Sequence, residues 1–367
     1  MANTKKKLQD AKSAKRDEFY TQLPDIEKEL VHYRDQFKGK TILCNCDDPE
    51  TSNFFTYFVL NLNFLGIKSL ITTHYAGPEN DSDSAYALVI NSANVDSILM
   101  LGSIDYDTLK SLRVPLKGDG DFRSEECTNY LKQADIVVTN PPFSLWRDFV
   151  NYLFEYDKQF IIIGNTNSLT YKDIFGYMKS NKLRIGYTNF NRGMFFVVPD
   201  SYKQYHHINE NGQKIARVST ACWYTTLDTE KAHRPLDLVF RYKGHESDYP
   251  TYDNYDAIEV SRVQDIPYDY MGIMGVPITF INKYSPDQFD IIGMAKGSDS
   301  FGATRTIKYI NPIQHKDGAV KKDNNLNAAP AIKLTTPPAQ KYYTADNSDG
   351  YLVSLYARIL IRRKSSN

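Results

Sequence analysis

The sequence has few cysteines and no long apolar segment. Four cysteines occur in 367 residues. Only Cys44 and Cys46 lie close together, without the second pair or neighbouring histidine that a zinc site needs. No apolar run approaches the ~20 residues that cross a bilayer, and residues 1–16 are rich in lysine without the hydrophobic core of a signal peptide. We therefore expect reduced thiols, no metal, no membrane association and a cytoplasmic location.

The sequence also lacks an excess of either charge. Its 44 basic residues balance 44 acidic ones, so net charge alone does not predict a nucleic-acid ligand. The distribution is uneven, because residues 291–367 contain 12 Lys or Arg and 5 Asp or Glu. A local basic excess is typical of phosphate contacts and also of a solvated surface, so it indicates a nucleic-acid ligand only weakly.

Short apolar segments alternate with helical patterns in the first part of the chain. Candidate strands at residues 41–45, 69–73, 136–139 and 160–164 are separated by helical spacing, which favours an α/β domain with a mainly parallel sheet. After about residue 228 the chain becomes rich in tyrosine and then in loops. We therefore predict a first domain over 1–230 and a second region over 231–367.

Three polar segments follow directly after predicted strands. They are residues 46–50, 140–143 and 165–167. In an open parallel sheet the ligand lies beyond the carboxyl ends of the strands, so we expect these segments to converge. The first loop has no Gly-x-Gly, which excludes an ordinary glycine-rich nucleotide turn.

The second of these segments, Asn140-Pro141-Pro142-Phe143, suits the activation of an aromatic amine. Such an amine is a poor nucleophile because its lone pair is delocalised into the ring. The Asn140 side-chain carbonyl and the Pro141 backbone carbonyl are acceptors for its two N–H groups, and Phe143 offers a flat face for a base. The prolines hold the acceptors in place, because they restrict their own φ and the preceding residue. We predict a catalytic site at these four residues.

The order of several segments resembles the EcoRI-type adenine-specific DNA methyltransferases, in the gamma arrangement of amino-methyltransferases. The resemblance rests on residues 17–21, 45–55, 118–124 and 134–143, and extends to 275–280 and 356–361. It implies a Rossmann-like fold for methyltransferases that depend on S-adenosylmethionine, with a C-terminal target-recognition region. It also implies S-adenosylhomocysteine as product, and double-stranded DNA as substrate, with the adenine flipped out of the stack.

The resemblance also implies a set of cofactor-binding residues. They are Phe19, Tyr20, Thr21, Asp47, Asp48, Pro49, Glu50, Asp121 and Phe122. An acid in the loop after the first strand suits the α-ammonium of the donor, while Asp121 and Phe122 match the stretch that meets its adenine. The end of the second strand lacks the acid that normally holds the cofactor ribose, and Glu50 or His74 are the candidates there.

DNA contacts are expected between about residues 231 and 341. Arg, Asn and Gln are the usual readers of base edges, so Arg305, Asn324, Asn325 and Asn327 are candidates. We expect a monomer, within a restriction-modification system whose endonuclease acts on the same site without stable association.

Three other functions remain open at this point. The same four-residue motif serves enzymes that methylate RNA adenine or a protein glutamine, so the acceptor is not fixed by the motif. A catalytically silent DNA-binding subunit is the third possibility, and the presence of both cofactor and acceptor segments argues against it.

Overall fold

The computed structural model describes residues 19–46, 48–76, 84–297 and 301–365. The chain divides into two compact units. The first comprises Met1–Leu169 and Leu183–Thr229, and the second comprises Thr170–Lys182 and Glu230–Asn367. The segment Thr170–Lys182, which carries α8 (Lys172–Lys179), therefore belongs to the second unit, although the sequence placed it in the first.

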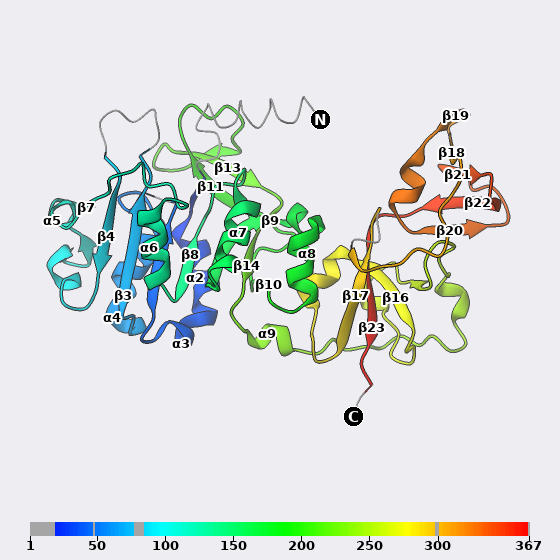
Figure 1. Ribbon diagram of the computed structural model, residues 1–367, viewed down its shortest axis with the longest axis horizontal. Coiled ribbons are helices and arrows are strands. Elements are labelled where there is room, and N and C mark those ends of the chain that lie inside the picture. Colours follow the sequence, from blue (N-terminus) through cyan, green and yellow to red (C-terminus); the bar gives the residue numbers. More distant parts are fainter. Residues whose placement is uncertain (1–18, 47, 77–83, 298–300, 366–367) are drawn as a thin grey trace. The chain divides into compact units, whose positions relative to one another are not determined.

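A mixed eight-stranded sheet forms the centre of the first unit (Figure 1). Its strand order is β10 (Arg184–Ile185), β14 (Ala221–Thr225), β9 (Gln159–Asn165), β8 (Ile136–Thr139), β2 (Thr41–Asn45), β3 (Ser69–His74), β4 (Tyr86–Ile90) and β7 (Val114–Pro115). Only β9, β8, β2 and β3 pair in parallel. The outer strands pair antiparallel, so the parallel pairing expected from the sequence is confined to the four central strands.

The connection between β3 and β4 explains one of the antiparallel pairs. Parallel neighbours need a crossover of a dozen or more residues, usually a helix. The chain from His74 to Tyr86 is too short for that, so β4 returns beside β3 in the opposite direction. The sequence predicted a surface insertion over residues 75–85, and residues 77–83 of it lie outside the described part.

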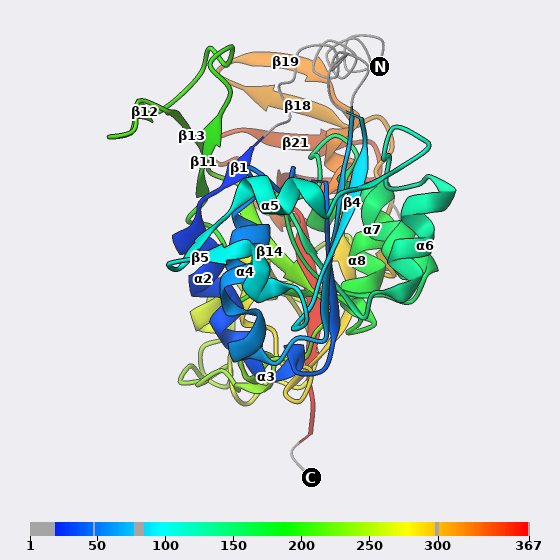
Figure 2. The same cartoon turned by 90° about the vertical axis from the view of Figure 1, so that its left-hand side faces the viewer.

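Helices cover both faces of this sheet. α2 (Leu23–Leu30), α3 (Arg34–Phe37) and α4 (Asn53–Leu65) lie on one side, and α6 (Glu125–Gln133) and α7 (Trp146–Glu155) lie on the other (Figure 2). α4 begins where the Ser52 hydroxyl accepts from the Phe55 N–H, and it ends at Gly66 with φ +62°, as its sequence predicts. Across the described residues, no helix is long and apolar enough to cross a bilayer.

The second unit contains two smaller sheets. The four-stranded sheet has the order β15 (Ile258–Glu259), β16 (Ile273–Pro277), β23 (Arg358–Arg363) and β17 (Phe289–Ala295). The five-stranded sheet has the order β19 (Ala319–Lys322), β18 (Ile313–Lys316), β21 (Tyr342–Ala345), β22 (Ser348–Ser354) and β20 (Ala331–Leu334). The sequence indicated that residues 296–338 are mostly loop. They supply three strands of the five-stranded sheet, namely β18, β19 and β20.

A buried ion pair holds the four-stranded sheet together. Arg358 on β23 donates to both carboxylate oxygens of Glu259 on β15 at 2.8 to 3.2 Å. The side chains are 12% and 3% exposed. The Tyr252 hydroxyl also donates to Glu259, and burial raises the pKa of that hydroxyl. The carboxylate therefore has donors on both oxygens, the condition under which a buried charge is tolerated.

Substituting Glu259 tests this pair. Glu259→Ala should lower the free energy of unfolding of the second unit by about 3–5 kcal/mol, because Arg358 stays buried without a counter-charge. Glu230→Ala is the matched control. It breaks the exposed pair of Glu230 with Arg234 and should cost less than about 1 kcal/mol. Equal losses in urea denaturation would show that the buried pair has no special role.

Candidate active site

A small antiparallel sheet lies beside the carboxyl end of β8, where Asn140 contacts Phe19. That sheet has the order β1 (Tyr20–Thr21), β11 (Met194–Val198), β13 (Lys214–Val218) and β12 (His207–Ile208). The Thr139 hydroxyl donates to the Asn45 carbonyl, which ties the end of β8 to the end of β2. Residues from both ends of the first unit are thus gathered at one edge of the central sheet.

Asn140 stands immediately after β8 with its amide fixed. Its Nδ2 donates to the Phe19 carbonyl at 2.5 Å. Its Oδ1 is buried and has no hydrogen-bond partner among the described residues, and the residue as a whole is 7% exposed. Buried polar atoms are almost always paired, so this unpaired oxygen is a candidate acceptor for a ligand. That Asn140 is an acceptor stays a prediction of the sequence, and no sequence signal pointed to the Phe19 carbonyl that fixes its amide.

The rings of Phe19 and of Phe143, in the predicted catalytic tetrapeptide, belong to one aromatic cluster. Phe19 lies 5.5 Å from Phe143, with an interplanar angle of 32°, and 5.5 Å from Phe196 in an edge arrangement. Tyr202 meets Phe19 at 5.8 Å. Phe143 is only partly buried, so part of its ring remains accessible. Phe196 and Tyr202 were not predicted, since they lie in a strand and loop that carry no recognisable motif.

Strand β1 is held on two sides. Tyr20 and Thr21 pair with Val197 and Phe196 of β11. On the other side the Asn53 Nδ2, at the start of α4, donates to the Thr21 carbonyl at 2.7 Å. Asn53 therefore fixes the strand that in turn fixes Asn140.

The loop after β2 is shaped by Asp48. Cys46 adopts a positive φ of 84°, and Asp47 lies outside the described residues. The Asp48 Oδ1 accepts from the Glu50 N–H at 3.0 Å and from the Tyr86 hydroxyl at 3.1 Å. Pro49, which stands between Asp48 and Glu50 in the sequence, is buried. The predicted cofactor loop is thus ordered by its own acid, which remains partly exposed.

Glu50 and His74, the two candidates for the cofactor ribose, differ in their surroundings. Glu50 forms an ion pair with Arg113, whose guanidinium lies 4.1 Å from the centre of the Tyr86 ring. His74 is buried at the end of β3 and stacks on Tyr86 at 4.9 Å. Its Nδ1 lies 3.8 Å from Asp48, and its buried Nε2 has no partner in the described structure. Of the two, only His74 offers a buried unpaired atom.

The turn that carries Asp121 and Phe122 lies against the end of β3. Gly120 has φ +80°, and a Cβ there would collide with the His74 carbonyl, so only glycine fits. Asp121 accepts two hydrogen bonds from the Arg123 side chain, at 2.9 and 2.6 Å. Phe122 is buried and meets Phe149 of α7 at 5.0 Å. Both predicted residues therefore have partners within the protein.

Unpaired buried polar atoms concentrate at this edge of the sheet. They are Thr21 Oγ1, Asn45 Oδ1, Thr72 Oγ1, His74 Nε2 and Asn140 Oδ1. The first four need a polar ligand other than the target base, and a nucleoside carrying an amino acid supplies hydroxyls, amines and a carboxylate. The site therefore fits S-adenosylmethionine. The described residues contain no group of three or more His, Cys, Asp or Glu side chains placed to hold a metal ion.

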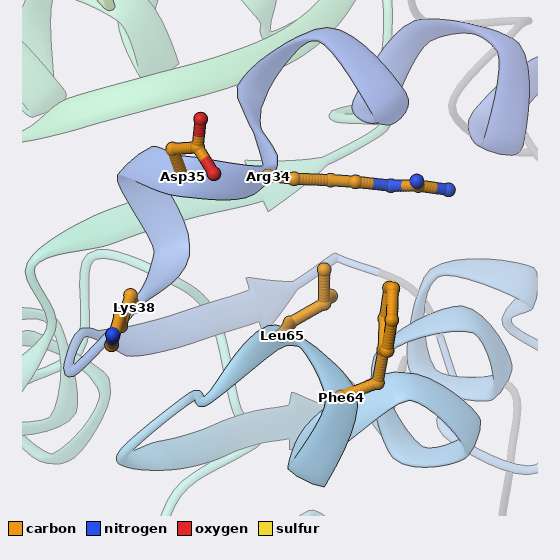
Figure 3. Close-up of a pocket in the computed structure, with 5 residues that line it drawn as sticks. All are labelled: Arg34, Asp35, Lys38, Phe64 and Leu65. Atoms are coloured by element: carbon orange, nitrogen blue, oxygen red, sulfur yellow. The ribbon is translucent and has the colours of Figure 1, made fainter.

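A shallow depression elsewhere on the first unit is not part of this site. It measures about 250 Å³ and is lined by Arg34, Asp35, Lys38, Phe64 and Leu65 (Figure 3). These residues belong to α3, the residue after it and the last turn of α4. Asn53 is at the opposite end of α4, roughly 20 Å away by the helical rise.

Comparison with known proteins identifies the family. The model of the family described as adenine-specific methyltransferase EcoRI matches residues 7–364. The chain belongs to this family. It is 44% identical to the type II methyltransferase M.EcoRI of Escherichia coli over 316 residues, which cover 81% of this chain and 91% of the relative. No solved structure matches the chain significantly.

Two mycoplasma proteins are also similar. The type II methyltransferase M.MgeORF184P of Mycoplasma genitalium is 38% identical over 319 residues, covering 86% of this chain and 93% of the relative. M.MpnI of Mycoplasma pneumoniae, also a type II methyltransferase, is 39% identical over 287 residues, which cover 77% of this chain and 83% of the relative. The protein is thus an adenine-specific DNA methyltransferase, as the resemblance implied.

The candidates for DNA contact in the second unit lie in different environments. Asn327 is buried, and its amide both accepts from the Tyr309 N–H and donates to the Tyr309 carbonyl. Arg305 is half-buried and donates to the Asn327 carbonyl at 3.1 Å. Asn324 and Asn325 are exposed at the start of a 3₁₀ turn. Asn327 therefore braces the turn from within, and the other three are accessible.

Asn53 offers a test of the support behind Asn140. Asn53→Ala should lower kcat about tenfold with little change in the KM for DNA, because the acceptor is positioned less well. Asn61→Ala is the matched control. Asn61 lies on the same helix, and its amide donates only to the Tyr57 carbonyl of that helix. Steady-state kinetics with equal losses in both variants would contradict a positioning role for Asn53.

Proposed function

We propose that the enzyme transfers a methyl group from S-adenosylmethionine to the 6-amino group of an adenine flipped out of duplex DNA. We further propose that it is the modification enzyme of a type II restriction-modification system. The similarity to three proteins named type II methyltransferases supports this. A cognate endonuclease would act on the same site without stable association, and the enzyme would act as a cytoplasmic monomer.

The acceptor chemistry follows from the unpaired oxygen of Asn140. The Asn140 Oδ1 and the Pro141 carbonyl accept from the two N–H groups of the target amine, while the face of Phe143 stacks on the base. Withdrawing both protons into hydrogen bonds concentrates the lone pair on nitrogen. Because Phe19 and Pro142 hold these groups before the base arrives, little reorganisation is required during the reaction.

The cofactor would occupy the edge formed by β1, β2 and β3. Phe19, Tyr20 and Thr21 would line its methionine end, and Asp47, Asp48, Pro49 and Glu50 would form the loop beside it. Asp121 and Phe122 would face its adenine, after Asp121 exchanges its contact with Arg123. When bound, the cofactor supplies an electrophilic methyl group, and the protein aligns the amine with it.

Target recognition would belong to residues 231–367, with catalysis in residues 1–230. The basic excess after residue 291 supports this division. Arg305, Asn324 and Asn325 are the proposed contacts to DNA, because they are accessible. Asn327 would act indirectly, by holding the turn that presents them.

Asn140→Ala should abolish methyl transfer while calorimetry still detects binding of S-adenosylmethionine, because the variant removes the acceptor and keeps β1 to β3. The exposed Asn129 on α6 provides the control, and Asn129→Ala should retain full activity. Near-normal turnover by Asn140→Ala would refute the assignment of the catalytic residue.

The acceptor can be identified directly. Tritium from labelled S-adenosylmethionine should appear in duplex DNA, and not in RNA or protein, when all three are offered together. Sequencing genomic DNA from a host that expresses the enzyme should then show 6-methyladenine within one defined motif. Label in RNA or protein alone would overturn the proposed function.

A further inference from the structure

The β18–β19 hairpin is a two-stranded ribbon at the rim of the five-stranded sheet. Asp317 and Gly318 join its strands with φ of 52° and 77°, as in the tight turns with positive φ at both positions that match strand twist. β19 is the outermost strand (Figure 2), and all four of its residues are exposed. The hairpin therefore presents a free strand edge to solvent.

Lysines project from both faces of this ribbon. Lys321 lies opposite Gln314, and Lys322 lies opposite Ile313. Successive side chains on a strand point to opposite faces, so Lys321 shares one face with Lys316 while Lys322 occupies the other. The Lys316 ammonium lies 4.0 Å from the Asp317 carboxylate, and the Lys321 ammonium lies 3.9 Å from the Asp323 carboxylate. For Lys322 no ion pair occurs within the described residues.

The dimensions and charge of the hairpin match the major groove of B-DNA. A sheet with its side chains is about 10 Å thick, and neighbouring strands are about 4.8 Å apart. The groove is about 12 Å wide and 8.5 Å deep, so it admits a ribbon two strands deep that enters by its edge. In that position each face of the ribbon lies next to one of the two phosphate backbones of the duplex.

Val320 distinguishes this role from simple protection of the edge. Lysines on an edge strand commonly prevent pairing with another chain. Val320, in the middle of β19, is 63% exposed, and an apolar side chain there weakens such protection. Val320 shares the face of Lys322, so in the groove it lies on the same side as Lys322, where apolar contacts with a thymine methyl occur.

We propose that the β18–β19 hairpin enters the major groove of the target DNA edge first. Lys316 and Lys321 face one phosphate strand, and Lys322 faces the other, with Val320 on the same face as Lys322. This inference rests on the proposed function, because it requires duplex DNA as the substrate.

The salt dependence of binding tests this proposal. Each phosphate contact contributes about −0.9 to the slope of log K against log salt concentration. The double variant Lys321→Gln/Lys322→Gln should therefore lose about 1.8 from the slope on a short mixed-sequence DNA duplex. Between about 50 and 200 mM salt, the wild type should then weaken about tenfold more than the variant does.

A matched control carries the same charge change elsewhere in the second unit. Lys243→Gln/Lys283→Gln removes two exposed lysines outside the five-stranded sheet and should keep the wild-type slope. Each single hairpin variant should lose about half of the double effect. A loss confined to one of them would overturn the edge-first geometry, and an unchanged slope in the double variant would overturn the hairpin contact altogether.

Methyl transfer is measured on the same samples, so that a failure of the hairpin proposal can be told from a failure of the proposed function. If the wild type methylates DNA and the double variant keeps the wild-type salt slope, the hairpin proposal fails and the proposed function stands. If the wild type methylates RNA or protein and no DNA, both fail. A-form RNA has a deep, narrow major groove that excludes the ribbon, so duplex RNA should show the same slope with the wild type and the double variant.

Discussion

The hydrogen bond from the Asn140 amide to the Phe19 carbonyl determines which atom of the side chain is free. An asparagine side chain has a donor end and an acceptor end of nearly the same shape. With a carbonyl fixed on one side, only one orientation avoids placing two acceptors against each other. Losing a buried hydrogen bond costs about 1–3 kcal/mol, which is enough to keep the Nδ2 on the Phe19 carbonyl and the Oδ1 free in most molecules. The acceptor is thus oriented by backbone 121 residues away.

The surrounding structure secures the position of that carbonyl. Glu29 on α2 is buried and accepts from Tyr33, from the Tyr187 N–H and from both the N–H and the hydroxyl of Thr188. It ties the helix after β1 to the segment before β11. Burial raises the pKa of Glu29, and its four hydrogen bonds act in the opposite direction. Gly186 has no room for a Cβ because the Glu29 carboxylate fills that space. Glu29 therefore connects α2, which follows β1, with residues 187–188, which precede β11, and so helps to hold both strands in place.

The sequence predicted those parts of the fold and the site that depend on local patterns. The central strands, the helix that ends at Gly66 and the Asn-Pro-Pro-Phe segment all have signals within a few residues. The Phe19 carbonyl has none, because any residue supplies a carbonyl and only the fold brings this one to Asn140. The strands at 313–334 were missed for a related reason. β19 is exposed on every residue, so it lacks the apolar alternation that marks a half-buried strand.

Three buried asparagines differ in how their amides are paired. Asn254 accepts from the Ala331 N–H and donates to the Ala329 carbonyl, so both ends of its amide are used. Asn327 pairs both ends with Tyr309. Asn140 is equally enclosed, yet it donates only. All three are buried asparagines, so neither burial nor residue type separates Asn140 from the other two. If, as we propose, a substrate N–H pairs with this acceptor, the hydrogen bond missing in the free enzyme forms when the base binds and contributes to its binding.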